Sequence, residues 1–138
     1  MDVSHVLHVD GVNVGKRFVI ELARTPKEWA KGLSGRTELS EGHGLFFVYQ
    51  TEEPRSFWMK GMLFPIDIIH IDESSRVVRV ERTVSPIKPN DELKLYPSRV
   101  PIKYALEVNA GESSDITTGN SCKLNFNNDI SRYILTFT

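Results

Sequence analysis

The sequence predicts a mainly β fold, at the margin of α+β, in which strands far outnumber helices. Three observations support this prediction. Short apolar or alternating runs of strand length recur along the chain, glycines and prolines separate them, and one segment, residues 26–31, carries strong signals of a helix. Seven to nine short strands around one short helix favour a compact sandwich or a partly closed barrel.

Composition fits one globular domain. The 138-residue chain is long enough to bury a sizeable core, and we expect residues 1–138 to form a single domain. Hydrophobic residues make up 40% and charged residues 25%, which argues against disorder. The formal net charge of −1 gives no electrostatic reason to expect nucleic acid as a partner.

The chain contains no apolar run of the roughly 18 residues that a transmembrane segment needs. Its N-terminus lacks a basic region followed by an apolar stretch, so the sequence as given predicts a soluble chain without a signal peptide. A leader that precedes this sequence stays open as an alternative.

The N-terminal third is expected to hold a hairpin, a strand and the helix. Asp10-Gly11 suits a tight hairpin turn, and alternation over residues 14–22 predicts a strand. Thr25 then offers an N-cap, and Glu28 completes a capping box with it. Gly32 is expected to end the helix after less than two turns, so the helix must dock on the sheet to be stable.

The remaining strands follow from apolar runs of strand length. They are expected near residues 45–49, 56–60, 66–71, 77–80, 102–108, 121–126 and 133–138, the last being a candidate edge strand. The clearest hairpin joins the third and fourth of these through the turn at residues 72–75. Four of the seven prolines fall within residues 85–101, which favours a crossing loop that is either rigid or a lid.

Three parts of the sequence carry a family resemblance. They are the phrases at residues 21–25, 32–36 and 44–48, the segment 57–72 with Phe-Trp-Met-Lys followed by Pro-Ile-Asp-Ile-Ile, and residues 105–111. Together they resemble the DUF192 (UPF0127) family of uncharacterised proteins, over about residues 17–125. The resemblance implies a compact β-rich domain, often exported or membrane-tethered, and implies no particular activity. Gly61 stands where the family usually has asparagine, which argues against a site role for an amide there.

Lys60 and Asp67 are the charged residues that most need an explanation, because they lie in an otherwise apolar segment. Gly61 and Pro65 between them could reverse the chain and bring the ammonium and the carboxylate together. Such a pair could bind a polar ligand or transfer protons. The alternative is structural: an ion pair, or Asp67 accepting backbone N–H groups of the Phe64-Pro65 turn.

Trp58, Arg36 and Glu107 complete the candidate ligand-binding residues. Trp58 and Lys60, two residues apart on a strand, should share a face, so the indole could wall a groove beside the ammonium. Arg36 could bind a carboxylate such as Glu107 or Glu21, either as a latch between helix and sheet or for anion recognition at a pocket mouth.

Other chemistries are disfavoured. Cys122 is the one cysteine, and we expect a buried, inert thiol. The four histidines are scattered, and His70 should point to the opposite face of its strand from Asp67, so neither a metal site nor an Asp67–His70 dyad is expected. Phosphate-cradling and dinucleotide motifs are missing, so we expect no cofactor.

Three hypotheses for the function follow. The first is a non-catalytic binding or interaction module, whose site around residues 57–72 holds a small polar ligand or a peptide segment. The second is a small hydrolase- or lyase-like enzyme in which Lys60 and Asp67 transfer protons. The third is a purely structural accessory domain.

Overall fold

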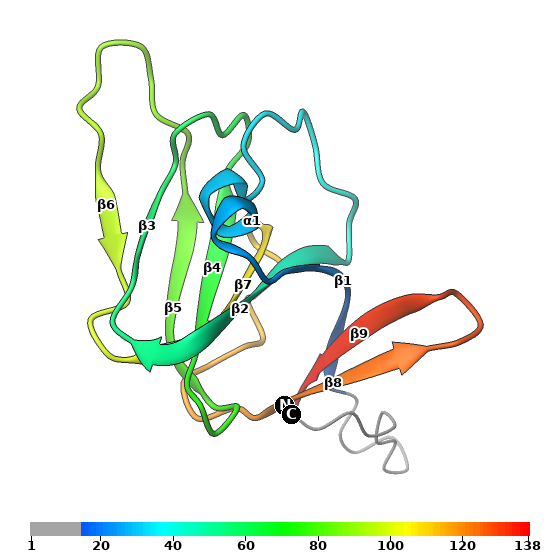
Figure 1. The fold of residues 1–138 in the computed structure, drawn as a ribbon. Helices are drawn as coiled ribbons and strands as arrows, with labels where there is room; N and C mark the ends of the chain where they lie inside the picture. The colour runs from blue at the N-terminus through cyan, green and yellow to red at the C-terminus, as the bar shows by residue number, and fades with distance from the viewer. Residues whose placement is uncertain (1–14) are drawn as a thin grey trace.

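The computed structural model describes residues 15–138, and its fold is mainly β, as predicted (Figure 1). The elements are β1 (Lys16–Ala23), α1 (Pro26–Lys31), β2 (His43–Glu53), β3 (Ser56–Trp58), β4 (Ile66–Ile71), β5 (Val77–Val84), β6 (Leu95–Pro97), β7 (Ile102–Asn109), β8 (Cys122–Asn127) and β9 (Arg132–Phe137). A seven-stranded sheet has the order β5-β4-β7-β2-β1-β9-β8, and β3 pairs with β6 in a second, two-stranded sheet. The expected hairpin at Asp10-Gly11 lies outside the described residues.

The helix forms where the capping signals predict it. The Thr25 hydroxyl accepts the backbone N–H of Glu28 at 3.2 Å, and the Glu28 carboxylate accepts the backbone N–H of Thr25, also at 3.2 Å. Gly32 ends the helix with φ +50°, a backbone conformation that favours glycine. The short helix connects β1 to β2, which pair in parallel, whereas the other neighbouring strands are antiparallel.

Two predictions about the strands need correction. The C-terminal strand β9 is not an edge strand, because it lies between β1 and β8, and β8 forms the edge. The proline-rich segment 85–101 is mostly loop but contributes the short strand β6, which pairs with β3 by placing Leu95 opposite Trp58.

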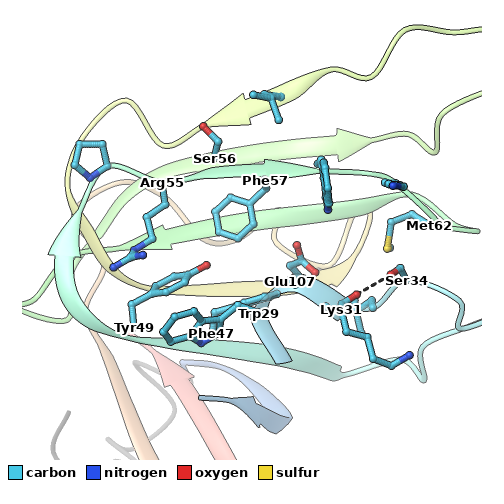
Figure 2. A pocket seen from close by; sticks show the side chains of 17 residues that line it. Trp29, Lys31, Ser34, Phe47, Tyr49, Arg55, Ser56, Phe57, Met62 and Glu107 are labelled. Carbon is cyan, nitrogen blue, oxygen red and sulfur yellow. Dashed lines mark hydrogen bonds between the residues drawn. The ribbon is translucent and has the colours of Figure 1, made fainter. Parts of the chain in front are cut away.

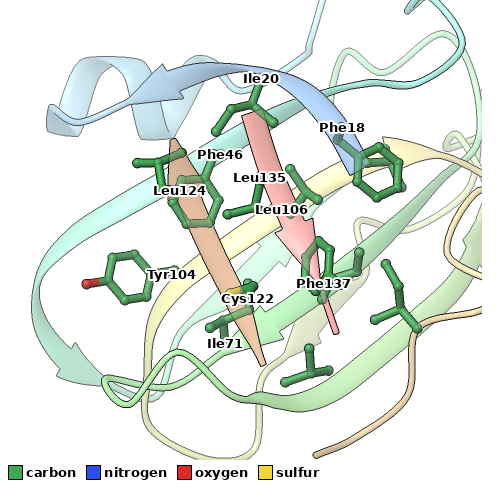
Figure 3. Packing of buried hydrophobic residues seen from close by; sticks show 14 residues of the cluster. Phe18, Ile20, Phe46, Ile71, Tyr104, Leu106, Cys122, Leu124, Leu135 and Phe137 are labelled. Carbon is green, nitrogen blue, oxygen red and sulfur yellow. The ribbon is translucent and has the colours of Figure 1, made fainter. Parts of the chain in front are cut away.

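The large sheet buries both of its faces. On one face the β8–β9 hairpin folds over the central strands, and Leu124, Leu135 and Phe137 pack against Phe46 and Leu106 (Figure 3). On the other face α1 and β3 cover a second cluster. Strand β4 serves both clusters: Ile66 and Ile68 belong to the second, and Ile69 and Ile71 to the first. This alternation decides which face each polar residue of the segment occupies.

Cys122 is buried in the first cluster, as expected. Burial raises the pKa of its thiol to about 12, so the sulfur stays protonated and unreactive at neutral pH. Among the described residues, no helix has the length and apolar character needed to cross a membrane.

His70 lies in β4 on the side of the second cluster, facing Phe57 at 5.4 Å between ring centroids. It is fully buried, and neither ring nitrogen has a hydrogen-bonding partner among the described residues. Burial lowers the pKa of His70 from 6.5 to about 4. The ring is therefore neutral in the folded protein at pH 7.

We expect His70 to weaken the fold in mild acid. The unfolded chain takes up a proton near pH 6.5 and the folded chain only near pH 4. The neutral His70 ring therefore makes its full contribution to the free energy of unfolding above pH 6.5. As the pH falls towards 4, the free energy of unfolding decreases by about 3 kcal/mol. His70→Leu should remove this loss, as urea unfolding at pH 7 and pH 4 can measure. Parallel pH dependences for wild type and variant would contradict the burial of a neutral ring.

Candidate functional site

A pocket of about 420 Å³ opens between α1, β2 and β3 (Figure 2). Its lining includes Trp29 and Gly32 from the helix region, Phe47 and Tyr49 from β2, Phe57 and Trp58 from β3, Lys60 and Met62 after β3, and Glu107 from β7. The volume is within the range of small-molecule sites, and the lining is mostly apolar with a few polar groups.

Aromatic rings form the walls of the pocket. Phe47 and Tyr49 lie two residues apart on β2, so both point to the same face. Phe57 meets Phe47 edge-on at 5.6 Å, and Trp29 lies 4.9 Å from Tyr49, both measured between ring centroids. The Trp29 indole N–H contacts two backbone carbonyls, Ala23 at 3.0 Å and Val48 at 3.2 Å, which docks the helix on the sheet. These four rings form an aromatic cage, and contacts among them and with the backbone hold it in place.

Glu107 provides a carboxyl group inside this cage. Its side chain is only 5% exposed, and no hydrogen bond or ion pair involves it among the described residues. Burial raises the pKa of Glu107 from 4.5 to about 8, with no opposing contribution from a partner. Figure 2 shows its carboxyl directed into the pocket. A buried acid without a partner is unusual, because unpaired buried polar groups destabilise a fold.

The surroundings of Glu107 explain its isolation. Its neighbours across the sheet are Leu45 on β2 and Ile68 on β4, which offer no polar side chain. On the pocket side, a Cβ atom added to Gly32 would lie 3.7 Å from a Glu107 carboxyl oxygen. The glycine therefore brings the end of α1 close over the acid. Burial also raises the pKa of the Tyr49 hydroxyl, and the charge of Glu107 contributes to this shift.

The rim of the pocket carries positive charge. Trp58 is 44% exposed, and the Lys60 Nζ lies 5.4 Å from the centre of its ring. The two side chains are therefore neighbours, although β3 ends at Trp58 and Lys60 lies in the turn that follows. Arg55 stacks its guanidinium on Tyr49 at 3.9 Å from the ring centre and donates to the Thr51 carbonyl at 2.8 Å. The Glu53 carboxylate also lies 3.5 Å from the Arg55 guanidinium, so the site combines a buried acid at its base with Lys60 and an ion-paired Arg55 at its mouth.

Asp67 does not belong to this site. It lies on the opposite face of β4 from Ile66 and Ile68, is 1% exposed, and does not line the pocket. No ion pair joins Asp67 to Lys60, although both residues are among those described, so the expected convergence of the two charges is wrong. The chain reversal at Gly61 does not overcome the alternation of side chains along β4.

The Asp67 carboxylate instead accepts four hydrogen bonds. The donors are the backbone N–H groups of Thr83 at 2.8 Å, Gly111 at 3.0 Å and Ser113 at 3.2 Å, and the Ser113 hydroxyl at 2.6 Å. The structural alternative named the acceptance of backbone N–H groups, but the donors are distant in sequence and do not come from the Phe64-Pro65 turn. Asp67 thus fastens the loop after β7 to the bulged end of β5.

Arg36 also lies outside the pocket. Its guanidinium donates to the Glu21 carboxylate at 2.6 Å, where it lines a separate, smaller cleft with Glu28 and Lys31. Of the two carboxylates considered for Arg36, Glu21 is the partner and Glu107 is not. The pair links the segment after α1 to β1, which agrees with a latch between helix and sheet.

The structure thus brings Trp58, Lys60 and Glu107 to one pocket and places Asp67 and Arg36 elsewhere. The aromatic cage, above all Tyr49, is not predicted from the sequence, because the apolar run at residues 45–49 by itself indicates only a strand. The period of two along that strand was a usable signal, since it puts Phe47 and Tyr49 on one face. Within residues 15–138, no group of three or more histidine, cysteine or acidic side chains is arranged to hold a metal ion.

The fold and the pocket define a class: a small β-rich domain with an aromatic cavity around a buried acid. The family model of DUF192, described as "Uncharacterized ACR", matches residues 7–125. The chain belongs to the DUF192 family.

Solved structures and curated proteins add the following. A crystal structure from Novosphingobium aromaticivorans DSM 12444, a protein of unknown function, is 35% identical, with TM-score 0.69, over 75% of this chain and 73% of that one. A crystal structure from Sinorhizobium meliloti 1021, described as a candidate transcription regulator, is 26% identical, with TM-score 0.70, over 75% of this chain and 79% of that one. No curated protein matches the chain in sequence.

Proposed function

We propose that this protein is a small non-catalytic binding module whose ligand enters the pocket between α1, β2 and β3. The observation that supports this proposal is Glu107, a carboxyl that is buried, unpaired and directed into a cavity of about 420 Å³. Burial disfavours the charged form of this acid in the free protein, and a ligand that hydrogen-bonds to it would offset that cost. The aromatic walls supply apolar contact, and the exposed Trp58 and Lys60 lie where the ligand would enter.

The alternatives have less support. Proton transfer by Lys60 with Asp67 needs both groups at one substrate, but Lys60 is at the pocket and Asp67 is bonded within the other face of the sheet. The hypothesis of a purely structural domain does not explain why Glu107 faces a cavity without a partner in the described part of the chain. That hypothesis predicts that no ligand changes the stability of the protein.

A thermal-shift screen of amines, guanidines, sugars, carboxylic acids and short peptides tests the proposal. At a hundred times its Kd, a ligand should raise stability by about 2.7 kcal/mol, and Tm by on the order of 10 °C. Lys60→Ala and Leu95→Ala change two exposed residues of the pocket rim and should weaken the response. Lys94→Ala and Leu93→Ala are matched controls: Lys94 also packs on an aromatic ring, at 4.9 Å from Tyr96, and Leu93 is also exposed, but neither lines the pocket.

Two outcomes would count against a binding module at this pocket. In one, no class of compound shifts the wild-type Tm. In the other, every compound that raises the wild-type Tm raises the Tm of the rim variants as much as that of their controls. Binding would then lie outside this pocket.

A further inference from the structure

The two buried carboxyl groups among the described residues have opposite surroundings. Asp67 accepts four hydrogen bonds, whereas Glu107 accepts none and faces aromatic rings in an open cavity. The carboxyl of Glu107 is the group at the base of the pocket that can carry a negative charge. The pKa of about 8 keeps this carboxyl protonated in the free protein at neutral pH. A positively charged donor that reaches it favours the carboxylate form, so the proton is released and a charge-assisted hydrogen bond forms, the strongest bond that this group can make.

The walls of the pocket suit a cation as well. The guanidinium of Arg55 lies 3.9 Å from the centre of the Tyr49 ring and 6.0 Å from that of Trp29, within the usual range of cation–π contacts. The cage thus already holds one organic cation of the chain itself at its edge. The Glu107 carboxyl is directed into the pocket that these rings line (Figure 2).

The rim has the opposite charge. Lys60 follows β3, and its ammonium contacts the Trp58 ring. Among the described residues, no carboxylate lies within ion-pair distance of Lys60. A ligand that is cationic along its whole length would be repelled here, whereas one with an anionic end would gain a partner for the ammonium.

We infer that the pocket takes a zwitterionic small molecule, whose ammonium or guanidinium head binds Glu107 between the aromatic rings and whose anionic end meets Lys60 at the rim. This inference rests on the proposed function and adds the chemical class of the ligand. The buried acid selects the head, because a neutral head of the same shape gives up the charge-assisted hydrogen bond. The rim lysine selects the tail.

Isothermal titration calorimetry with 4-guanidinobutyrate and 6-aminohexanoate tests the inference. We expect at least one of them to bind the wild-type protein. For the guanidino compound, 4-ureidobutyrate keeps the shape but has a neutral head, and propylguanidine keeps the head but lacks the anionic end. We expect affinity to fall at least tenfold for the first analogue and at least fivefold for the second.

Two variants separate the roles of the base and the rim. Glu107→Gln should bring 4-guanidinobutyrate and 4-ureidobutyrate within threefold of each other. Lys60→Ala should weaken 4-guanidinobutyrate at least fivefold but leave propylguanidine unchanged, and Lys94→Ala should behave as wild type. Because the lysine is exposed, its variant should fold, and it keeps the test usable even where Glu107→Gln is unstable.

The results distinguish failure of the inference from failure of the proposed function. One outcome is that neither zwitterion binds, but a neutral compound from the screen does, and the Lys60 and Leu95 variants weaken its binding. The pocket is then a ligand site, but its ligand is not zwitterionic. Equal affinity of wild-type protein for the guanidino and ureido compounds would also overturn the inference. If neither the zwitterions nor any screened compound binds, the proposed function fails as well.

Discussion

Glu107→Gln should leave the free energy of unfolding nearly unchanged at pH 4.5 and make the protein more stable than wild type by about 4 kcal/mol at pH 9. The physical reason is the raised pKa. The folded protein holds the Glu107 proton up to about pH 8, whereas the unfolded chain releases it near pH 4.5. At 1.36 kcal/mol per pKa unit, the shift corresponds to a stability difference of roughly 4–5 kcal/mol.

The direction of this effect follows from the sign of the shift. Because the pKa of Glu107 is higher in the folded state, its contribution to the free energy of unfolding is complete below pH 4.5. This contribution is lost as the pH rises through about 8. Glutamine has nearly the same shape and no charge, so the variant lacks this loss. Urea unfolding of both proteins at several pH values between 4.5 and 9 measures the difference directly.

Glu21→Gln is the control for this experiment. Glu21 pairs with Arg36, but half of its side chain is exposed, so the variant should differ from wild type by less than about 1 kcal/mol at any of these pH values. If the curves of wild type and Glu107→Gln run parallel, Glu107 is not a buried acid without a partner. The basis of both proposals would then be lost.

The second large effect is expected at Asp67. Asp67→Asn should destabilise the protein by about 3–5 kcal/mol at pH 7, because the carboxylate uses both of its oxygens as acceptors, and hydrogen bonds to a charged group contribute about 1.5–3 kcal/mol each. An amide can accept through only one atom. Its NH₂ group must then face N–H donors, whichever way it is turned.

The structure around Asp67 allows little adjustment. Between the pairs Ile66–Val84 and Ile68–Glu81, two residues of β5 stand opposite Asp67, which is a β-bulge. One of them, Thr83, has φ +52°, an uncommon conformation for a β-branched residue, and its N–H donates to Asp67. Losing this acceptor releases both the bulge and the loop that begins at Gly111.

Asp72→Asn is the matched control. Asp72 accepts the backbone N–H groups of Ser74 at 2.9 Å and Arg76 at 3.0 Å through one oxygen, in an exposed turn. An asparagine oxygen can accept both bonds, so this variant should lose less than about 1 kcal/mol. Urea unfolding gives both values. A loss at Asp67 as small as that at Asp72 would show that the four bonds do not hold the loop.

Local signals predicted the elements of this fold well. The capping box at Thr25 and Glu28 is a contact between near neighbours, so its residues alone specify where the helix begins. The face assignment within β4 also held, because His70 lies on the opposite face from Asp67. Each of these depends on spacing along a single element, which the sequence contains completely.

Contacts between distant segments were predicted less well. The partners of Asp67 come from β5 and from the loop after β7, and the contact between Arg36 and Glu21 was one of two that the residue types allowed. Tyr49 and Glu107 line the same pocket because β7 pairs with β2 in the register that sets Glu107 opposite Leu45. That register depends on burying both faces of the sheet at once, and no single strand encodes it.

The sequence by itself thus determined a mainly β domain of the DUF192 family, with one capped helix and a distinctive segment at residues 57–72. Only the tertiary structure decided which charges of that segment share a site. Strand alternation turns Asp67 into the opposite face, where backbone donors bind it. Strand pairing brings Glu107 from β7 beneath Gly32 and among the aromatic rings, where burial leaves its carboxyl without a partner. The unexplained acid of this protein is therefore Glu107.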